Sequence, residues 1–388
     1  MCPDGLRSRA FRRILLIKLS AVGDVIHTIP VLNKLRRRYP NAQIDWLVKP
    51  AIGELLRHHP AVSDVIDFTG LAAASAPLGL SSTVRYVRLS AMLRATGYDL
   101  VIDMHGQLRT AILTLATGAP VRIGFDRPRA RVWDASPRKL PEETRKHAWQ
   151  GAREGSWLAY THIIPVPTLE IHAVDRYLNV GRLLDLEEGS ADFSFPIPHE
   201  ASRRVSGLLD YHGVANAELI VMAPGTIWET KQWPSDHFAQ VAHHFLQKDF
   251  SVVLVGTDRE RAACAKVAAL EPRVVDLSGE TTLSELAALI RRATICVTND
   301  SGPMHLAVAL KRPVVSVFGP TDPTWIGPYR RDGAVLQAIM PCSPCYLREL
   351  NRCIHGHACM KGVTADAVIN RTEDILRRQR VLVDAIAG

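Results

Sequence analysis

The sequence predicts an α/β protein of two doubly wound domains, each a parallel sheet with helices on both faces. Short apolar runs typical of buried strands alternate with segments of helical period along most of the 388 residues. The alternation occurs twice, before and after a stretch at 187–200 that is rich in acids, small residues and prolines. The length suits two or three domains.

Composition narrows the class of protein. Hydrophobic residues make up 47% and charged residues 22%, which is ordinary for a globular chain with a large core. The net charge of +8 favours anionic partners: phosphorylated ligands, a membrane surface or nucleic acid. No uncharged apolar run is long enough to span a membrane, and the run at 14–17 is too short for a signal peptide. We therefore expect a cytoplasmic protein.

The first half reads as four strand and helix units. Strands are expected at 13–18, 43–48, 65–68 and 98–103, and helices at 25–39, 52–58, 84–95 and 174–186. The stretch 122–153 interrupts this order, with nine Lys or Arg residues, four acids and three prolines. We expect a basic, loop-rich excursion there, which is either a solvated surface or a surface that meets anions.

The second half repeats the pattern. Strands are expected at 219–223, 251–255, 274–277, 294–298 and 313–318, and helices at 238–248, 260–269, 283–292, 302–310 and 365–387. The predicted domains are 1–195, which would bind the acceptor, and 196–365, which would bind the nucleotide. Residues 366–388 would form a helix that packs back on the first domain. Doubly wound domains bind ligands at the carboxyl ends of their strands, so we expect a cleft between the two domains.

The segment 297–305, Val-Thr-Asn-Asp-Ser-Gly-Pro-Met-His, predicts a phosphate site. A buried strand is followed within four residues by a helix, whose first amides and positive dipole end suit a diphosphate. Ser301 adds a hydroxyl, Gly302 permits close approach to the backbone, and His305 is a donor. The alternative is an ordinary helix cap by Asp300 or Ser301. The strand, glycine and histidine together favour the phosphate site.

A second candidate segment is 223–234, which also follows a strand. Thr226 offers a hydroxyl and Lys231 a compact cation suited to a phosphate. Trp228 and Trp233 are expected to wall the pocket. The alternative is a surface loop with a solvated lysine, and two tryptophans argue against it.

Two further places complete the predicted donor site. Asp258 and Glu260 follow the strand at 251–255, where an acid binds the ribose hydroxyls in other doubly wound nucleotide sites. The sequence does not separate these two acids. Leu283, at the start of the helix 283–292, is added to this set.

The segment 19–27 follows the first strand and contains Gly23 and Asp24. It matches neither the dinucleotide-binding G-x-G-x-x-G pattern nor a Walker loop. Asp24 is either a helix cap or a general base, since an acceptor hydroxyl needs a positioned carboxylate to take its proton.

Three of these segments together resemble glycosyltransferase family 9, the bacterial heptosyltransferases of lipopolysaccharide core synthesis. The matching runs are 14–30, 225–234, 298–307 and 318–323, with weaker agreement at 103–107, 122–125 and 172–177. The resemblance covers roughly residues 12 to 325, in order. It implies a GT-B fold and an inverting transfer from ADP-heptose that needs neither a metal nor another cofactor.

The resemblance also implies residue roles. Asp24 matches the general base, Thr226 and Lys231 match phosphate binders, and the donor pocket corresponds to Asp300, Ser301, Gly302 and His305. The implied acceptor is a phosphorylated, Kdo- or heptose-bearing lipid A core. The enzyme would then be peripheral at the inner face of the inner membrane. Positive residues would meet the anionic groups of the acceptor: Arg85, Arg88, Arg122 and others of the stretch 122–153. No nucleic-acid-binding motif is visible, so no nucleic acid partner is expected.

Four of the seven cysteines are clustered near the C-terminus, at Cys342, Cys345, Cys353 and Cys359, with His355 and His357 among them. The cluster has enough ligands for a tetrahedral zinc or iron site, and its first pair has zinc-knuckle spacing. The alternative is a set of thiols in a loop before the last helix. Similar cysteines occur in several proteins of the family that the chain resembles. A bound metal would be structural, because the cluster lies outside the segments with chemistry.

Other functions stay open at the level of sequence. The same donor chemistry fits a protein or another glycan as acceptor. A GT-B-like sugar-nucleotide epimerase needs no second substrate. A non-catalytic nucleotide-binding protein needs no base at position 24.

Overall fold

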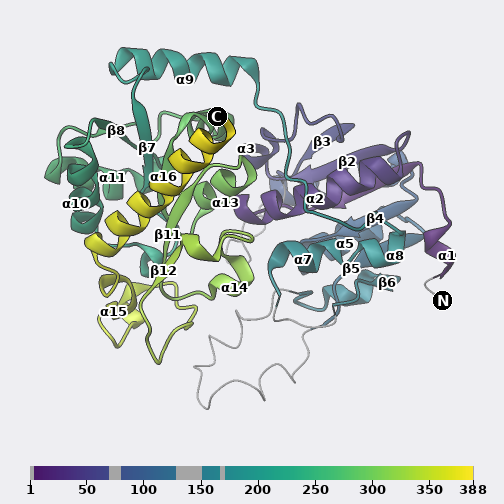
Figure 1. The fold of residues 1–388 in the computed structure, drawn as a ribbon. Coiled ribbons are helices and arrows are strands. Elements are labelled where there is room, and N and C mark those ends of the chain that lie inside the picture. The colour runs from purple at the N-terminus through teal and green to yellow at the C-terminus, as the bar shows by residue number, and fades with distance from the viewer. Residues whose placement is uncertain (1–3, 70–79, 128–150, 167–170, 388) are drawn as a thin grey trace. The chain divides into compact units, whose positions relative to one another are not determined.

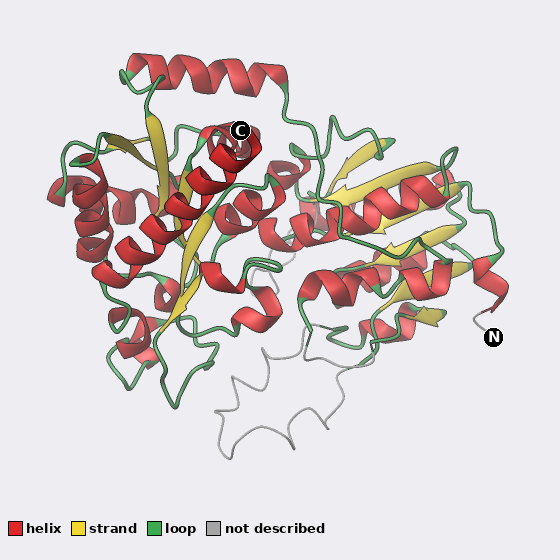
Figure 2. Ribbon diagram, viewed as in Figure 1, coloured by secondary structure: helices red, strands yellow, loops and turns green. Residues whose placement is uncertain are grey.

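The computed structural model describes residues 4–69, 80–127, 151–166 and 171–387. The chain folds into two compact units, and the first ends at Pro196 while the second begins at Ile197. This boundary lies one residue from the expected one. Each unit is a parallel six-stranded sheet with helices packed on it (Figures 1 and 2). The prediction of an α/β protein with two doubly wound sheets is therefore confirmed.

The sheet of the first unit has the strand order β3-β2-β1-β4-β5-β6. Its strands are β1 (Arg13–Ile17), β2 (Gln43–Val48), β3 (Asp64–Asp67), β4 (Leu100–Asp103), β5 (Val121–Gly124) and β6 (His162–Ile163). Its helices are α1 (Asp4–Arg7), α2 (Val22–Arg38), α3 (Pro50–Gly53), α4 (Leu80–Thr96), α5 (Leu108–Ala116), α7 (Ala173–Leu178) and α8 (Gly181–Leu184), with a 3-10 turn η2 (Ser156–Ala159). The order places β1 between β2 and β4, so β1 is buried on both sides.

Burial explains why the strands were predictable in the first unit. Residues Ile14 to Ile17 have no exposed surface, and Leu16 pairs with Trp46 on one side and Ile102 on the other. A strand buried on both faces is a continuous apolar run, and such a run is visible in a sequence. Helix α2 begins three residues before the expected start, so Gly23 and Asp24 lie in its first turn.

Shorter elements of the first unit differ from the expectation. The helix expected at 52–58 is only α3, and the helix expected at 174–186 is broken into α7 and α8. We did not expect α5, β5 or β6. Strand β5 occupies the start of the basic stretch 122–153, and residues 128–150 of that stretch lie outside the described residues. Apart from α5, these elements have two to six residues and leave little periodicity to detect.

The sheet of the second unit has the order β12-β11-β10-β7-β8-β9, again all parallel. Its strands are β7 (Glu218–Ala223), β8 (Phe250–Leu254), β9 (Val275–Asp276), β10 (Ile295–Asn299), β11 (Val314–Phe318) and β12 (Val335–Gln337). Its helices are α9 (His199–Tyr211), α10 (Ser235–Leu246), α11 (Arg261–Leu270), α12 (Leu283–Arg292), α13 (Gly302–Ala309), α14 (Pro323–Ile326), α15 (Ala358–Lys361) and α16 (Ala365–Ala387). Short 3-10 turns are η3 (Glu229–Lys231), η4 (Asp258–Glu260), η5 (Asp332–Ala334) and η6 (Leu350–Arg352). Helix α9 and strand β12 were not expected.

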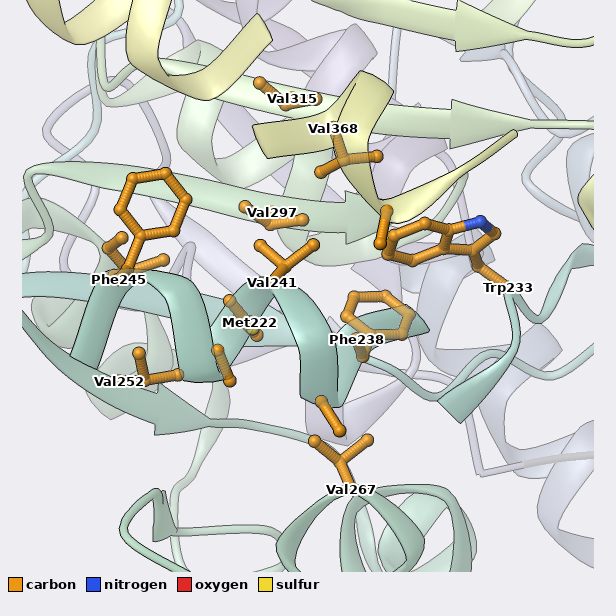
Figure 3. Packing of buried hydrophobic residues seen from close by; sticks show 14 of the residues in the cluster. Met222, Trp233, Phe238, Val241, Phe245, Val252, Val267, Val297, Val315 and Val368 are labelled. Carbon is orange, nitrogen blue, oxygen red and sulfur yellow. The ribbon is translucent and has the colours of Figure 1, made fainter. Parts of the chain in front are cut away.

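The core of the second unit packs α10 on the sheet (Figure 3). Phe238, Val241 and Phe245 lie on one face of α10, and they meet Met222 of β7 and Val297 of β10. Positions three and four residues apart share a helix face, which is why these three side chains point the same way. The sequence pattern of α10 thus specifies the packing.

Helix α16 has the predicted limits, and its described contacts lie within the second unit. It packs against α10 and β11, and Val368 and Leu376 belong to the core of the second unit. We expected it to pack back on the first domain, and that expectation stays a prediction. An amphipathic pattern shows that a helix is half-buried but does not name the surface that covers it.

No helix in the described ranges is long and apolar enough to cross a membrane.

Candidate active site

The loops after β7, β10 and β11 bring three polar side chains together. These strands are neighbours in the parallel sheet, so the loops at their carboxyl ends meet at one edge. Lys231 Nζ lies 2.6 Å from Asp300 Oδ2, and the Thr321 hydroxyl donates to that same oxygen at 2.7 Å. The Asp300 side chain is only 4% exposed and that of Lys231 12%. The predicted residues Lys231 and Asp300 therefore form a nearly buried ion pair.

Asn299 fixes the loop that carries Lys231. Its Oδ1 accepts a hydrogen bond from the Trp233 amide at 3.0 Å, and its Nδ2 donates to the carbonyl of Pro224 at 2.7 Å. Thr226 is buried in the same loop, and its carbonyl accepts from the Gln232 side chain at 3.1 Å. The last residue of β10 thus holds both ends of the loop after β7.

The start of α13 has no side-chain cap. Ser301 occupies the cap position, but its hydroxyl bonds to the Asn299 carbonyl at 3.3 Å and not to an amide of the helix. Gly302 and Pro303 form the first positions, and His305 is buried in the first turn. An ordinary cap was the alternative interpretation of this segment, and the described contacts do not contain one. The first amides of α13 stay available to an anion.

The loop after β8 separates the two candidate ribose-binding acids. Asp258 is 81% exposed and pairs with Arg261 at 3.0 Å. Glu260 turns back and accepts from the Thr257 amide at 2.7 Å. A Cβ atom placed on Gly225 would lie 2.4 Å from the Glu260 Cβ, so the loops after β7 and β8 touch at this glycine. Half-buried Leu283 begins α12, after β9.

The two tryptophans of the loop after β7 have different surroundings. Trp233 is 2% exposed and belongs to the core, and its indole donates to the Val363 carbonyl at 2.8 Å. Its expected place in a pocket wall is therefore wrong. Trp228 is half-buried and has two cations over its ring, Lys231 at 4.4 Å and Arg348 at 4.8 Å from the centroid.

In the first unit, Asp24 lies among three partners. The Tyr177 hydroxyl donates to Asp24 Oδ1 at 2.9 Å, and the Ala21 amide donates to Oδ2 at 3.1 Å. Lys18 Nζ is 3.6 Å from Oδ1 and also donates to the Tyr177 oxygen at 2.8 Å and the Met104 carbonyl at 2.9 Å. The Lys18 side chain is 6% exposed and that of Asp24 36%. Asp24 thus has a buried cation on one side and an accessible carboxylate edge.

The interactions among Asp24, Lys18 and Tyr177 keep both Asp24 and Lys18 ionised. Burial opposes the charged form of Asp24, but Lys18, the Ala21 amide and the Tyr177 hydroxyl together hold the pKa of Asp24 below its ordinary value. Burial also opposes the charge on Lys18, and Asp24 and Tyr177 together raise the pKa of Lys18 above its ordinary value. Asp24 is therefore ionised at neutral pH, as a proton acceptor must be. It also bonds the Ala21 amide, so it acts as a cap as well.

The loop after β4 borders the same group. Asp103 accepts from the His105 and Gly106 amides at 2.8 and 3.0 Å and from the Tyr160 hydroxyl at 2.9 Å. Burial and the positive charges of Lys18 and Arg109 lower the pKa of His105 to about 3. His105 is thus neutral near pH 7, and Arg109 lies 3.1 Å from its Nε2.

The three predicted acceptor-binding arginines are placed differently. Arg85 and Arg88 lie exposed on α4, whose inner face packs Tyr86, Leu89 and Leu93 on the sheet. The Arg122 guanidinium donates to the carbonyls of Ala159 at 2.8 Å and Ala119 at 2.6 Å. Arg122 therefore ties β5 to η2, whereas the two arginines of α4 are available to a ligand.

The cysteine segment, residues 342–359, packs against the loops after β7 and β11. Cys359 and Met360 fill the space beside Gly319, where an added Cβ would lie 2.9 and 2.4 Å from their sulfur atoms. Burial, together with the nearby Cys345, Cys342 and Cys353, raises the pKa of the Cys359 thiol to about 11. The structure thus brings the four cysteines near one another. Among the described residues, no group of three or more His, Cys, Asp or Glu side chains has an arrangement that would hold a metal ion.

A cavity of about 550 Å³ lies elsewhere in the second unit, at the amino end of β11. It is lined by Pro313, Val314 and side chains of α16 that include Arg371 and Arg378. Ligands of doubly wound sheets bind at the carboxyl ends of the strands, so this cavity is not the donor site.

Comparison with known proteins places the chain in a family. The sequence profile of glycosyltransferase family 9 (heptosyltransferase) matches residues 86–150 and 141–353, which is more than half of the chain. The chain belongs to glycosyltransferase family 9. Its sequence is 32% identical over 346 residues to lipopolysaccharide heptosyltransferase 1 of Pseudomonas aeruginosa, with 86% of each protein covered.

Solved structures of this family share the fold. The ADP-heptose lipopolysaccharide heptosyltransferase II of Escherichia coli superimposes with a TM-score of 0.72 at 22% identity, over 95% of this chain and 99% of that one. The Escherichia coli heptosyltransferase WaaC with ADP superimposes with a TM-score of 0.66 at 25% identity, over 93% and 99% of the two chains. The predicted family and its GT-B fold are confirmed, and the chain is a sugar-transferring enzyme.

Several residues of this family 9 chain were missed as site residues in the sequence. Lys18 and Tyr177 surround Asp24, and Thr321 and Asn299 support the Lys231–Asp300 pair. A lysine that ends an apolar strand is a usable signal for a buried cation with a partner. Tyr177 and Thr321 lie inside runs that resemble the family, but their partners become visible only in three dimensions.

Proposed function

We propose that this chain is an inverting heptosyltransferase that transfers heptose from ADP-heptose to the inner core of lipopolysaccharide. The observation that carries the donor assignment is the Lys231–Asp300–Thr321 group beside the uncapped start of α13. Helix amides, a lysine and hydroxyl groups at the carboxyl edge of a parallel sheet suit a diphosphate. Membership of the heptosyltransferase family 9 favours heptose as the sugar, and the ADP-heptose enzyme of Escherichia coli with the same fold favours ADP as the nucleotide.

In this proposal the second unit holds the donor. Lys231, His305 and the first amides of α13 stabilise the negative charge that grows on the departing diphosphate, and Thr226 adds a hydroxyl. Glu260 binds the ribose rather than Asp258, because Glu260 turns toward Gly225 at the sheet edge while Asp258 points to solvent. Leu283 offers an apolar surface to the adenine ring of the nucleotide. These groups supply part of the positive charge that the leaving group needs.

The first unit supplies the base. Asp24 takes the proton from an acceptor hydroxyl, and the oxygen forms a bond to the anomeric carbon on the face opposite the diphosphate. The bond from that carbon to the diphosphate oxygen breaks, and ADP leaves with the electron pair. The configuration at the carbon is therefore inverted. Lys18 and Tyr177 orient Asp24 and do not touch the reacting atoms.

We further propose that the acceptor is a phosphorylated lipid A core and that the enzyme meets it at the inner face of the inner membrane. The support is the α4–α5 face, the solvent-facing side of these two helices, which pack against each other. It exposes large apolar side chains whose exposed fractions run from 42% to 60%: Val84, Val87, Met92, Leu108, Ile112 and Leu115. Arg85 and Arg88 lie beside them, and neither helix contains an acid. Apolar side chains mixed with cations suit an anionic lipid surface.

The proposal is tested first by calorimetry of the purified protein with ADP- and UDP-sugars, and then by transfer to purified lipid A core. We expect ADP-heptose to bind most tightly and the acceptor mass to increase by one heptose unit. Tighter binding of a UDP-sugar would reject the donor. Transfer to a protein or another glycan instead of lipid A core would reject the acceptor. Release of ADP without any acceptor would favour an epimerase-like reaction.

A further inference from the structure

The ion pair between Lys231 and Asp300 reduces the positive charge that Lys231 presents to a phosphate. The two charged groups are 2.6 Å apart and nearly buried, so the lysine charge already has a carboxylate partner. An incoming diphosphate meets a pair whose net charge is close to zero. The amides of α13 carry only partial charge. A site for a nucleoside diphosphate with this arrangement needs another cation nearby.

Arg348 is such a cation. Its guanidinium lies 4.8 Å from the centroid of the Trp228 ring, the same ring that lies 4.4 Å from Lys231 Nζ. It is exposed and, among the residues that the structure describes, it has no acidic partner. Stacking on an aromatic ring orients a guanidinium and leaves its N–H groups free to bond a phosphate in two places at once.

The backbone on both sides of Arg348 is bonded to the short turn η3, which carries Lys231. The Thr230 hydroxyl donates to the Leu347 carbonyl at 2.5 Å, and the Leu350 amide donates to a carboxylate oxygen of Glu229 at 3.0 Å. His357 Nε2 lies 2.7 Å from the Thr230 carbonyl. Two adjacent residues of η3 therefore hold the segment before and after Arg348.

The rest of the cysteine segment is anchored to the core of the second unit. The Tyr346 amide donates to the Pro320 carbonyl at 2.8 Å, and the Tyr346 ring is buried and stacks on Trp325 at 6.0 Å. Cys359 and Met360 pack beside Gly319, in the loop that also carries Thr321. The cysteine segment thus links the loop after β11 to the turn η3, and Arg348 projects from it toward Trp228.

We infer that Arg348 is a second cation of the donor site that binds the diphosphate of the sugar nucleotide beside Lys231, and that the cysteine segment exists to position it. The inference rests on the proposed function of this site. The cysteine segment lies outside the motifs of phosphate binding, and the group that Arg348 recognises is a diphosphate rather than a sugar or a nucleobase.

The test compares ADP with adenosine as calorimetric ligands of the full chain. Arg348→Ala should weaken ADP binding about tenfold, the size of one charge-assisted contact, and leave adenosine binding unchanged because adenosine has no phosphate. The ADP affinity of Arg348→Lys should lie between those of Arg348→Ala and the parent protein, since lysine keeps the charge and loses the planar stacking. Arg352→Ala, a cation of the same segment outside this contact, is the matched control and should bind ADP as the parent protein does.

A second variant tests whether the contact of Thr230 with the cysteine segment positions Arg348, as distinct from a general loss of folding. Thr230→Val keeps the shape of the side chain but removes the hydroxyl that holds the Leu347 carbonyl, so ADP binding should weaken with little change in adenosine binding. Equal ADP affinity in Arg348→Ala and the parent protein would overturn the inference, and so would an equal loss of ADP and adenosine binding. If the parent protein does not bind ADP at all, the proposed function fails instead.

Discussion

Tyr177 donates its hydroxyl hydrogen to Asp24 Oδ1 over 2.9 Å, although the two residues are 153 positions apart in the chain. The same hydroxyl accepts a hydrogen bond from Lys18. Tyr177 therefore connects the buried cation to the proposed base and keeps both oriented. A base with a pKa below its ordinary value is weak in solution, so its contribution to the reaction must come from position and not from basicity.

The first prediction concerns the pH dependence of transfer. Loss of activity in acid should follow protonation of Asp24, and the depressed pKa places this loss at a lower pH than the titration of an ordinary aspartate. Tyr177→Phe removes one hydrogen bond to the ionised form, so the pKa of Asp24 should rise and the acid limb of kcat/KM should move to higher pH. Tyr39→Phe, which loses only a long bond to the Leu184 carbonyl, should leave the limb in place.

Other charged groups act on Asp24 and on its two partners. Lys18 and His105 both interact with it, Asp103 acts on Lys18, and Arg176 acts on Tyr177. His105 has a pKa of about 3, so its imidazole is neutral at any pH well above that value. The stability that ionised Asp24 contributes is present above its unfolded pKa and is lost as the pH falls through its lower folded pKa. A limb that does not move in Tyr177→Phe would mean that this hydroxyl does not act on the base.

The second prediction separates chemistry from donor binding. Asp24→Asn keeps the size of the side chain and removes the proton acceptor, so the transfer rate should fall by about 10² to 10⁴. Binding of ADP, measured by calorimetry, should stay unchanged because Asp24 lies in the first unit. Intact mass of the acceptor over time gives the rate. Full activity of Asp24→Asn would exclude Asp24 as the base.

The third prediction concerns the Lys231–Asp300 pair. Lys231→Met leaves the buried Asp300 carboxylate without its cation, so the free energy of unfolding should fall by about 3 kcal/mol. Adding Asp300→Asn removes that unpaired charge and should restore much of the stability but not the binding of ADP. Thermal unfolding and calorimetry measure the two effects separately. Recovery of ADP binding in the double variant would show that Lys231 does not bind the phosphate.

The fourth prediction tests the contact between the loops after β7 and β8. Gly225→Ala places a methyl group 2.4 Å from the Glu260 Cβ, so one loop must move. We expect a loss of about 1–3 kcal/mol in unfolding free energy and weaker ADP binding, because Glu260 is displaced. Gly207→Ala is the matched control, since nothing lies within 4 Å of its added Cβ. An unchanged ADP affinity in Gly225→Ala would argue against Glu260 as the ribose ligand.

The fifth prediction concerns the α4–α5 face. Val87→Asp together with Ile112→Asp puts acids among the exposed apolar side chains, so binding to vesicles of phosphatidylglycerol should be lost in a cosedimentation assay. The parent protein should bind these vesicles more strongly than vesicles of phosphatidylcholine, and increasingly so at low salt.

The control for the membrane surface lies in the second unit. Leu270 is 60% exposed on α11, so Leu270→Asp changes a similar side chain away from the α4–α5 face and should not reduce vesicle binding. Equal binding of the parent protein and the Val87→Asp, Ile112→Asp variant would exclude this face as the membrane contact. The same variant should keep its affinity for ADP.

Local patterns were enough to predict many elements of the fold. Strand β2 and helices α12 and α16 have the limits that the sequence indicated, because a buried strand or an amphipathic helix leaves a repeating apolar pattern in neighbouring residues. Helix α5, helix α9 and strand β12 were missed. Strand β12 has only three residues, and the exposed face of α5 is itself apolar, which hides its amphipathic period.

The sequence by itself determined the class of the protein, the two sheets and the segments proposed to bind phosphate, because strand ends, glycines and helix starts are adjacent in the chain. Only the tertiary structure decided the partners. It paired Lys231 with Asp300, Tyr177 with Asp24 and Arg348 with Trp228. These contacts join residues 69, 153 and 120 positions apart by number, and they depend on which strands are neighbours in a sheet. That order follows from packing the whole chain and leaves no local signal at either residue.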